Sequence, residues 1–239
     1  SLSRRHVRFY NMGIYARIKP FIPKQICVLC MQYSDFCVCK ECEQSLVSAQ
    51  HRCQSCATVL KSSLHFCGAC LAKAPPFSKA YTVYDYSGSC TTLIKHFKFD
   101  HQLCVGDFFA HQLHNKYIDI VAKHGEYDAI IPLPLSKQRL RERGYNQTHE
   151  LLRIIAKKSD ILIDQKSVKR IKATRALSTL DLQERQSEIK NAFSAQAMNY
   201  QKVLLVDDVM TTGSSLNELA KTVLKAGVGS CDVLTLARA

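Results

Sequence analysis

Residues 203–216, VLLVDDVMTTGSSL, combine side chains whose types and order suit phosphate chemistry. The apolar, β-branched run 203–206 predicts a strand buried on both faces. Asp207 and Asp208 follow, then a turn of hydroxyl residues around Gly213, and then an amphipathic helical pattern from Leu216 with Gly227 as its expected C-cap. A strand, a turn and a helix N-terminus in this order direct backbone N–H groups at an anion.

This turn predicts a phosphate site, although two carboxylates beside a phosphate would repel it. The conflict is removed if the ligand carries ribose hydroxyls that donate to Asp207 and Asp208, with a divalent cation nearby. The alternative is a solvated strand end followed by an ordinary helix cap. Nothing structural in that alternative requires so many hydroxyls in one turn.

Residues 27–70 hold nine of the 12 cysteines, and eight of these form four Cys-x-x-Cys pairs. Such a pair places two thiolates on one side of a tight turn, which is half of a tetrahedral zinc shell. We therefore expect two structural zinc sites, with the pairs joined in sequence order. Cross-braced pairing, Cys37 in place of Cys39, and His51 or His65 as ligands stay open, and a disulfide scaffold is the competing interpretation. The predicted metal ligands are Cys27, Cys30, Cys39, Cys42, Cys53, Cys56, Cys67 and Cys70.

A basic loop follows the pattern YDAIIPLP of residues 127–134, which predicts another buried strand. Arginine forks match phosphate oxygens in pairs, so this loop suits a pyrophosphate, and its alternative is an exposed basic helix face. A helix is expected over 148–158. The candidate ligand-binding side chains of the loop are Lys137, Arg139, Arg141, Arg143, Asn146 and Gln147.

The remaining patterns supply the elements that would position these residues. Residues 80–86 and 231–236 read as strands, and residues 91–99, 108–121 and 181–191 read as helices. Alternating strands and helices predict an α/β fold with a parallel sheet, whose ligand lies beyond the carboxyl ends of the strands. Cys90 and Cys104 are expected to be buried as small apolar side chains. We expect a basic arm (1–24), a zinc-binding module (25–76) and an α/β domain (77–239), with Ala74-Pro75-Pro76 at the boundary.

The net charge of +13 is concentrated in two regions, 1–24 and 137–175, which suggests a polyanionic partner. The alternative for the N-terminal region is a solubility device or an unstructured tail. The sequence has no run of 18 or more apolar residues, so we expect no transmembrane helix. Residues 1–24 also lack the apolar core of a signal peptide. These features favour a cytoplasmic location.

VLLVDDVMTTGSSL resembles the phosphoribosyl-pyrophosphate (PRPP) motif of type I phosphoribosyltransferases. With the Cys-x-x-Cys pairs, IIPLPLSKQRLRERGYNQ, ERQSEIKNAF and VLTLAR, residues 27–239 are similar to the ComF family of competence-associated proteins. The resemblance implies a phosphoribosyltransferase-like sheet behind a double zinc ribbon, with magnesium accompanying PRPP. It implies PRPP binding by Pro132, Leu133, Pro134, Asp207, Asp208, Val209, Met210, Thr211, Thr212, Gly213, Ser214 and Ser215.

The resemblance also implies a role in natural transformation, handling incoming single-stranded DNA at the cytoplasmic face of the membrane with partners such as a helicase. Two alternatives stay open: a non-catalytic DNA-binding protein with a sensory PRPP site, and a nucleobase-salvage phosphoribosyltransferase. One departure concerns the acceptor. Leu177 stands near a position where the family often has glutamine, which leaves open whether transfer takes place.

Overall fold

The computed structural model describes residues 25–61, 63–99, 102–135, 140–141, 146–172 and 189–239. The basic arm 1–24 and most of the helix expected over 181–191 therefore lie outside the described residues. In the part of the chain that is described, no helix is both long and apolar enough to cross a membrane.

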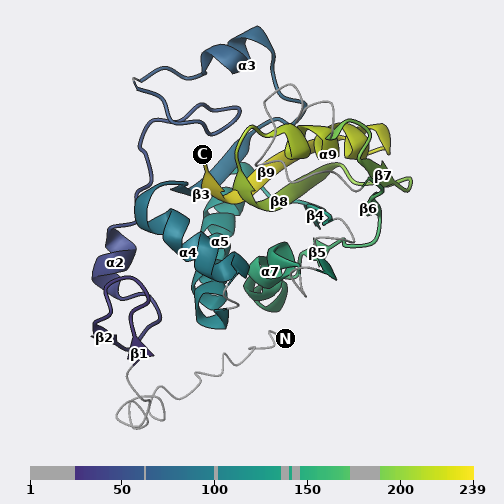
Figure 1. The fold of residues 1–239 in the computed structure, drawn as a ribbon. Coiled ribbons are helices and arrows are strands. Elements are labelled where there is room, and N and C mark those ends of the chain that lie inside the picture. The colour runs from purple at the N-terminus through teal and green to yellow at the C-terminus, as the bar shows by residue number, and fades with distance from the viewer. Residues whose placement is uncertain (1–24, 62, 100–101, 136–139, 142–145, 173–188) are drawn as a thin grey trace, which may run out of the picture.

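The centre of the fold is a five-stranded parallel sheet with the order β3-β9-β8-β4-β5 (Figure 1). This confirms the predicted α/β class. The strands are β3 (Ala80–Asp85), β4 (Ala129–Pro132), β5 (Leu162–Ile163), β8 (Lys202–Met210) and β9 (Ser230–Arg238). The side chains of β8 point alternately to the two faces of the sheet and so belong to two cores. Leu204 and Val206 pack in one apolar cluster, whereas Val203 and Leu205 pack in the other.

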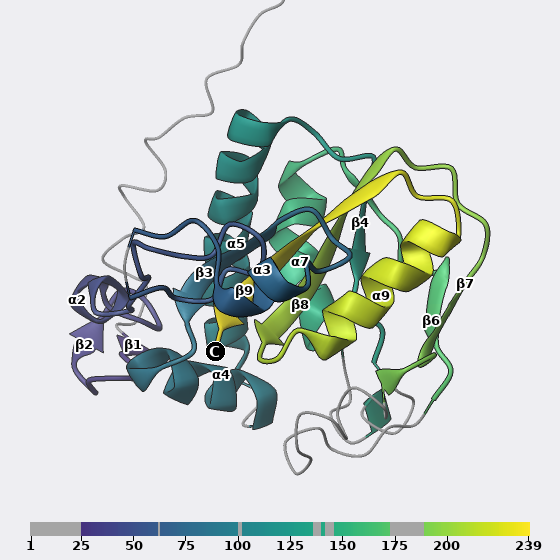
Figure 2. The same ribbon diagram turned by 90° about the horizontal axis from the view of Figure 1, so that it is seen from above.

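Helices cover both faces of the sheet (Figures 1 and 2). One face carries α4 (Gly88–Phe99), α5 (Leu103–His124) and α7 (Gln147–Lys158), which share a core cluster with Leu204 and Val206. The other face carries α9 (Ser214–Lys225) and an antiparallel pair, β6 (Val168–Arg170) and β7 (Phe193–Ala195), which the sequence patterns did not predict.

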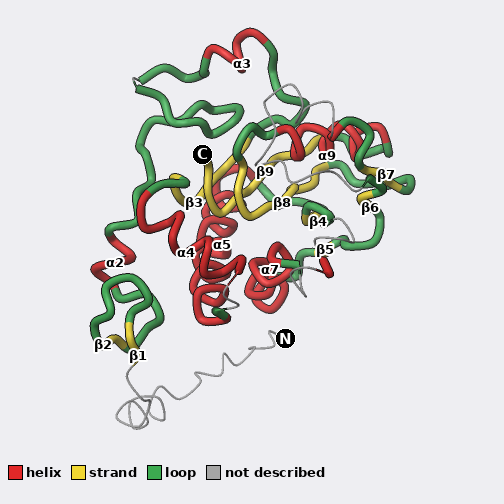
Figure 3. Tube along the Cα trace, viewed as in Figure 1, coloured by secondary structure: helices red, strands yellow, loops and turns green. Residues whose placement is uncertain are grey.

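The cysteine-rich segment is mostly loop (Figure 3). Its short elements are β1 (Gln25–Ile26), β2 (Tyr33–Ser34), α2 (Lys40–Gln44) and α3 (Gly68–Ala72). The first knuckle, residues 25–46, buries Cys37, Val38 and Leu46 in the cluster of α4 and α5. The second knuckle, residues 53–70, buries Ala57 in the cluster of α9. The two knuckles therefore pack into the cores on opposite faces of the sheet.

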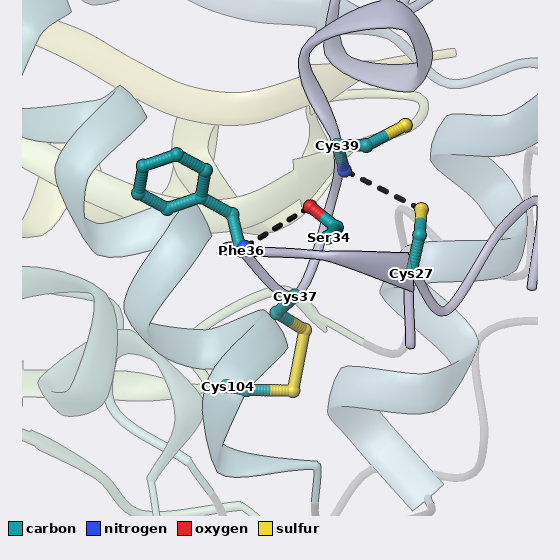
Figure 4. The surroundings of a disulfide bond; sticks show 6 residues. All are labelled: Cys27, Ser34, Phe36, Cys37, Cys39 and Cys104. Carbon is teal, nitrogen blue, oxygen red and sulfur yellow. Dashed lines mark hydrogen bonds between the residues drawn. A yellow bond between two sulfur atoms is a disulfide. The ribbon is translucent and has the colours of Figure 1, made fainter. Parts of the chain in front are cut away.

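A disulfide joins Cys37 to Cys104 and ties the first knuckle to the first turn of α5 (Figure 4). The expectation that Cys104 is a buried small apolar residue is wrong, because Cys104 is exposed and its sulfur is bonded to that of Cys37. Cys90 is buried at 1% exposure, as expected. The sequence could not show this pairing, since the two cysteines are 67 residues apart.

Candidate functional site

The phosphate-type turn lies where β8 ends and α9 begins. Gly213 is the N-cap residue of α9 with a φ of 76°, a left-handed conformation that favours glycine. Gly213 has no side chain to cap the N–H groups of the first turn, of which that of Ser214 donates to the Thr212 hydroxyl at 3.4 Å. The hydroxyls of Thr212 and Ser214 lie 2.9 Å apart beside them. The turn thus offers N–H groups, hydroxyls and a helix N-terminus to one anion.

The two carboxylates lie within β8 rather than after it. β8 was expected over 203–206, but it continues to Met210 because β9 runs beside it and pairs Asp207 with Thr235. The backbone N–H of Asp208 donates to Asp207 at 2.8 Å, and that of Val209 donates to Asp208 at 2.6 Å. Adjacent residues of a strand point to opposite faces of the sheet, so Asp207 and Asp208 lie on opposite faces, near the carboxyl end of β8.

Lys98 is a member of this site that sequence reasoning missed. Its Nζ lies 2.8 Å from Oδ2 of Asp208, and the two side chains are only 17% and 12% exposed. A helix that crossed back over the sheet would carry its last residues away from the carboxyl edge. The long helix α5 makes that crossing, whereas α4 lies across the edge and brings its last turn to Asp208 (Figure 2).

Pro132, Leu133 and Pro134 lie beside the carboxylates. Pro132 is paired with Val206, and the N–H of Leu133 donates to the Val206 carbonyl at 2.8 Å. Leu133 is buried, so it can offer only backbone to a ligand, while Pro134 is partly exposed. The structure therefore brings two of the predicted segments, 132–134 and 207–215, together at one edge of the sheet.

The basic loop is only partly described. Lys137, Arg139 and Arg143 lie outside the described residues, as does Leu177, and Arg141 is exposed. Asn146 caps α7, and its side chain accepts from the N–H of Thr148 at 3.1 Å. Gln147 begins α7 and is 1% exposed.

Past the basic loop, positive charge continues along the chain from α7 past the edge strand β5 to β6, a stretch called here the α7–β6 edge. Five lysines from this part of the chain are exposed to solvent: Lys157, Lys158, Lys166, Lys169 and Lys172. These five positive charges of the predicted basic region therefore lie on the surface of the protein.

The eight cysteines of the four pairs gather into two clusters in sequence order, one in each knuckle. All ligand sulfurs of a cluster lie within 4.8 Å of one another. Cross-braced pairing is therefore wrong, and the disulfide scaffold is wrong for these eight cysteines because their thiols are free. Cys37 is no ligand, since it is bonded to Cys104. The first cluster is Cys27, Cys30, Cys39 and Cys42, and the second is Cys53, Cys56, Cys67 and Cys70.

The donor sets of both clusters fit zinc. In each knuckle a backbone N–H donates to the first sulfur. The N–H of Cys39 donates to Cys27 at 3.4 Å (Figure 4), and that of Cys67 donates to Cys53 at 3.3 Å. Burial raises the pKa of Cys27, but hydrogen bonds from three backbone N–H groups and a neighbouring thiol outweigh it and lower the pKa to about 6.

The second cluster shows the same pattern. Burial raises the pKa of Cys56, but the hydroxyl and N–H of Thr58 and two neighbouring thiols lower it to about 6. The pKa of Cys70 is raised, first by burial and then by the neighbouring sulfurs. Thiols this close cannot all lose their protons without a cation between them, and four sulfurs leave no open position on a tetrahedral ion. The clusters are therefore suited to structural zinc.

No family model matches the chain, but several known proteins are similar to it. The chain is 38% identical to Competence protein F of Haemophilus influenzae over 176 residues, which cover 71% of this chain and 77% of that protein. It is 28% identical to DNA utilization protein YhgH of Escherichia coli K12 over 219 residues, 89% of this chain and 96% of that one. It is 30% identical to Competence protein ComFC of Bacillus subtilis over 66% of this chain and 63% of that one. The chain belongs to the ComF family of competence proteins.

Proposed function

We propose that this protein binds PRPP and is a phosphoribosyltransferase-like member of the DNA-uptake machinery. The observation that carries the proposal is the position of Asp207 and Asp208, which lie between the turn at Gly213 and the backbone of Leu133 at one edge of the sheet. A ligand with a phosphate, a ribose and a pyrophosphate needs these three kinds of partner in one row.

In this proposal each group of the site meets a different part of PRPP. The N–H groups and hydroxyls of residues 211–215 hold the 5′-phosphate, and Asp207 and Asp208 accept from the ribose hydroxyls. The backbone of residues 132–134 and the cationic loop hold the pyrophosphate. Magnesium bound with PRPP would neutralise the charge of the pyrophosphate. The chain's own contribution is positioning and charge stabilisation, since the pyrophosphate is already a good leaving group.

The cellular role rests on the relatives, whose names place them in competence and in DNA utilization. We propose that this chain handles incoming single-stranded DNA in the cytoplasm, at the inner face of the membrane, alongside a helicase of the uptake machinery. The exposed lysines of the α7–β6 edge support this part of the proposal, because phosphate contacts supply most of the affinity for a strand bound without sequence preference.

The test of PRPP binding is calorimetric titration of PRPP with magnesium into the zinc-loaded protein. Asp207→Asn should weaken binding by about tenfold or more, since one charge-assisted hydrogen bond is worth about 1.5–3 kcal/mol. Asp160→Asn is the matched control, because Asp160 is exposed and precedes β5, at the opposite edge of the parallel sheet. Absence of binding by the folded wild type would refute the proposal.

A second pair of measurements separates transfer from sensing and tests the DNA ligand. A transferase releases pyrophosphate when PRPP meets its acceptor, whereas a sensor binds PRPP and releases none. Binding to an oligothymidylate should weaken steeply with salt, and the double variant Lys157→Gln/Lys158→Gln should reduce the slope of log K against log salt by about 1.4, because each phosphate contact to a single strand contributes about 0.7. A slope unchanged in this double variant would exclude the α7–β6 edge as the DNA surface.

A further inference from the structure

The second knuckle and the phosphate turn meet at one side chain, Arg238, at the end of β9. Arg238 is 9% exposed and makes hydrogen bonds to both the knuckle and the turn. Towards the knuckle, its Nε donates to the carbonyl of Cys56 at 3.0 Å and its Nη2 donates to the hydroxyl of Thr58 at 2.5 Å. Towards the turn, its Nη1 donates to the carbonyl of Met210 at 3.1 Å and to that of Thr211. One guanidinium thus joins two segments that are far apart in the sequence.

On the knuckle side, the contacts reach a metal ligand directly. Cys56 belongs to the second cluster. Arg238 therefore holds the carbonyl of a residue whose sulfur would bind zinc. The thiol of Cys56 also lies 3.3 Å from the hydroxyl of Thr58, the group to which Arg238 donates. Two short routes, one through the backbone and one through a hydroxyl, therefore connect the metal position to the guanidinium.

On the other side, Arg238 holds the backbone that leads into the anion-binding turn. The carbonyls of Met210 and Thr211 precede Gly213 by two or three residues, so their orientation sets that of the following N–H groups. The planar guanidinium has donors in a rigid fork and can hold several carbonyls at once, which no other side chain can do. Cys56, Cys67 and Cys70 line the same cleft of about 1330 Å³ as Thr212 and Gly213.

The first knuckle differs, although its sulfur geometry is nearly the same. Apart from apolar packing, its described bonds to the rest of the fold run to α5, through the disulfide to Cys104 and through a 2.6 Å hydrogen bond from Gln112 to Glu43. Figure 1 shows α2 of the first knuckle beside α4 at the left of the molecule, and α3 of the second knuckle at the top. The first cluster therefore serves as an internal control for the second. The two are alike, but only the second has a described bond to the arginine that holds the phosphate turn.

We propose that the second zinc site sets the conformation of the phosphate turn through Arg238, so that zinc in the second cluster and PRPP in the turn stabilise one another. Arg238 is a positioning residue in this inference, which rests on the proposed function. Because coupling between two sites is reciprocal, PRPP must slow the loss of zinc from the second cluster by the factor by which that zinc strengthens PRPP binding, provided that zinc exchange tracks affinity.

The experiment measures zinc release from the full chain to a chromophoric chelator, with and without PRPP and magnesium. Cys42→Ser and Cys70→Ser, one in each cluster, assign the two kinetic phases. We expect PRPP to slow the phase of the second cluster by about fivefold or more and to leave the first phase unchanged. In Arg238→Met this protection should disappear, while Arg238→Lys should keep part of it. If Arg238→Met does not fold, Thr58→Val removes one of the two routes and should reduce the protection.

The outcomes separate the two proposals. Calorimetry that shows no PRPP binding by the zinc-loaded wild type overturns the proposed function, and the coupling with it. PRPP binding with both phases unchanged, or with both slowed equally, overturns the coupling alone. Protection that persists in full in both Arg238→Met and Thr58→Val also overturns it, because the link would then run elsewhere. A purely structural role for Arg238 would lower stability without making zinc release depend on PRPP.

Discussion

The ion pair between Lys98 and Asp208 leads to a prediction that can be worked through from the structure. Their atoms are 2.8 Å apart, and the side chains are 17% and 12% exposed. At an effective dielectric constant of 20, the Coulomb attraction at this distance is about 6 kcal/mol, most of which is offset by the loss of hydration of both charges. Lys98→Met would leave the Asp208 carboxylate poorly hydrated and without its cation. We expect this variant to lose about 3 kcal/mol of unfolding free energy.

The assay is a double-mutant cycle by urea unfolding, followed by circular dichroism, on zinc-loaded protein. Asp208→Asn in the Lys98→Met background removes the unpaired charge, so the cycle should give a coupling energy of about 2 kcal/mol. In thermal unfolding, a loss of 3 kcal/mol corresponds to a fall of roughly 6–12 °C for a chain of this size. Lys95→Met is the matched control, because Lys95 is exposed on the same helix. A coupling energy below about 0.3 kcal/mol would refute the reasoning, since it is within the error of additivity.

Three further predictions concern the metal, a turn and pH. Cys39→Ser should lose one of two zinc ions per chain by elemental analysis, whereas Cys37→Ser should keep both. Gly227→Ala should cost about 3 kcal/mol in urea unfolding, because Gly227 has a φ of 109° and its added Cβ would lie 2.5 Å from the carbonyl oxygen of Met198. The pKa of His114 is lowered by burial and nearby positive charge, so the unfolded state binds its proton first as pH falls below 6.5. His114→Gln should therefore lose less unfolding free energy than the wild type between pH 7 and pH 5.

Each of these three predictions has an outcome that contradicts it. Equal zinc content in the two cysteine variants would mean that the first cluster is not the one in the structure. Gly68→Ala is the control for the glycine, because a Cβ at Gly68 meets no atom within 4 Å, and equal effects of the two substitutions would contradict the clash. A pH dependence unchanged by the histidine substitution would show that other groups cause the loss in acid.

The sequence predicted those parts of the site that are local in the chain. The order of strand, carboxylates, turn and helix around Gly213, and the four cysteine pairs, depend on neighbours in sequence, and the structure keeps both. The predicted class of fold is confirmed for the same reason, because alternation of buried strands and amphipathic helices is a local pattern.

The parts that the sequence could not predict depend on partners remote in the chain. The extension of β8 as far as Met210 requires β9 beside it, and the Cys37–Cys104 disulfide requires a fold that brings α5 to the first knuckle. Lys98 lies in a helix that was predicted correctly in kind, but its direction across the sheet edge is set by packing. The binding roles assigned to residues 207–215 and 132–134 stay predictions until a ligand is measured.

The bond between Arg238 and Cys56 has a consequence for how the chain is made. The two residues are 182 positions apart, so at 5–20 residues per second a ribosome needs roughly 9–36 s to add the arginine after the cysteine. During that interval the second knuckle can bind its metal, but the partner that joins it to the turn does not yet exist. The turn at Gly213 thus gains this support only when β9 enters the sheet, so a nascent chain holds all four cysteines of the second cluster before that turn is complete.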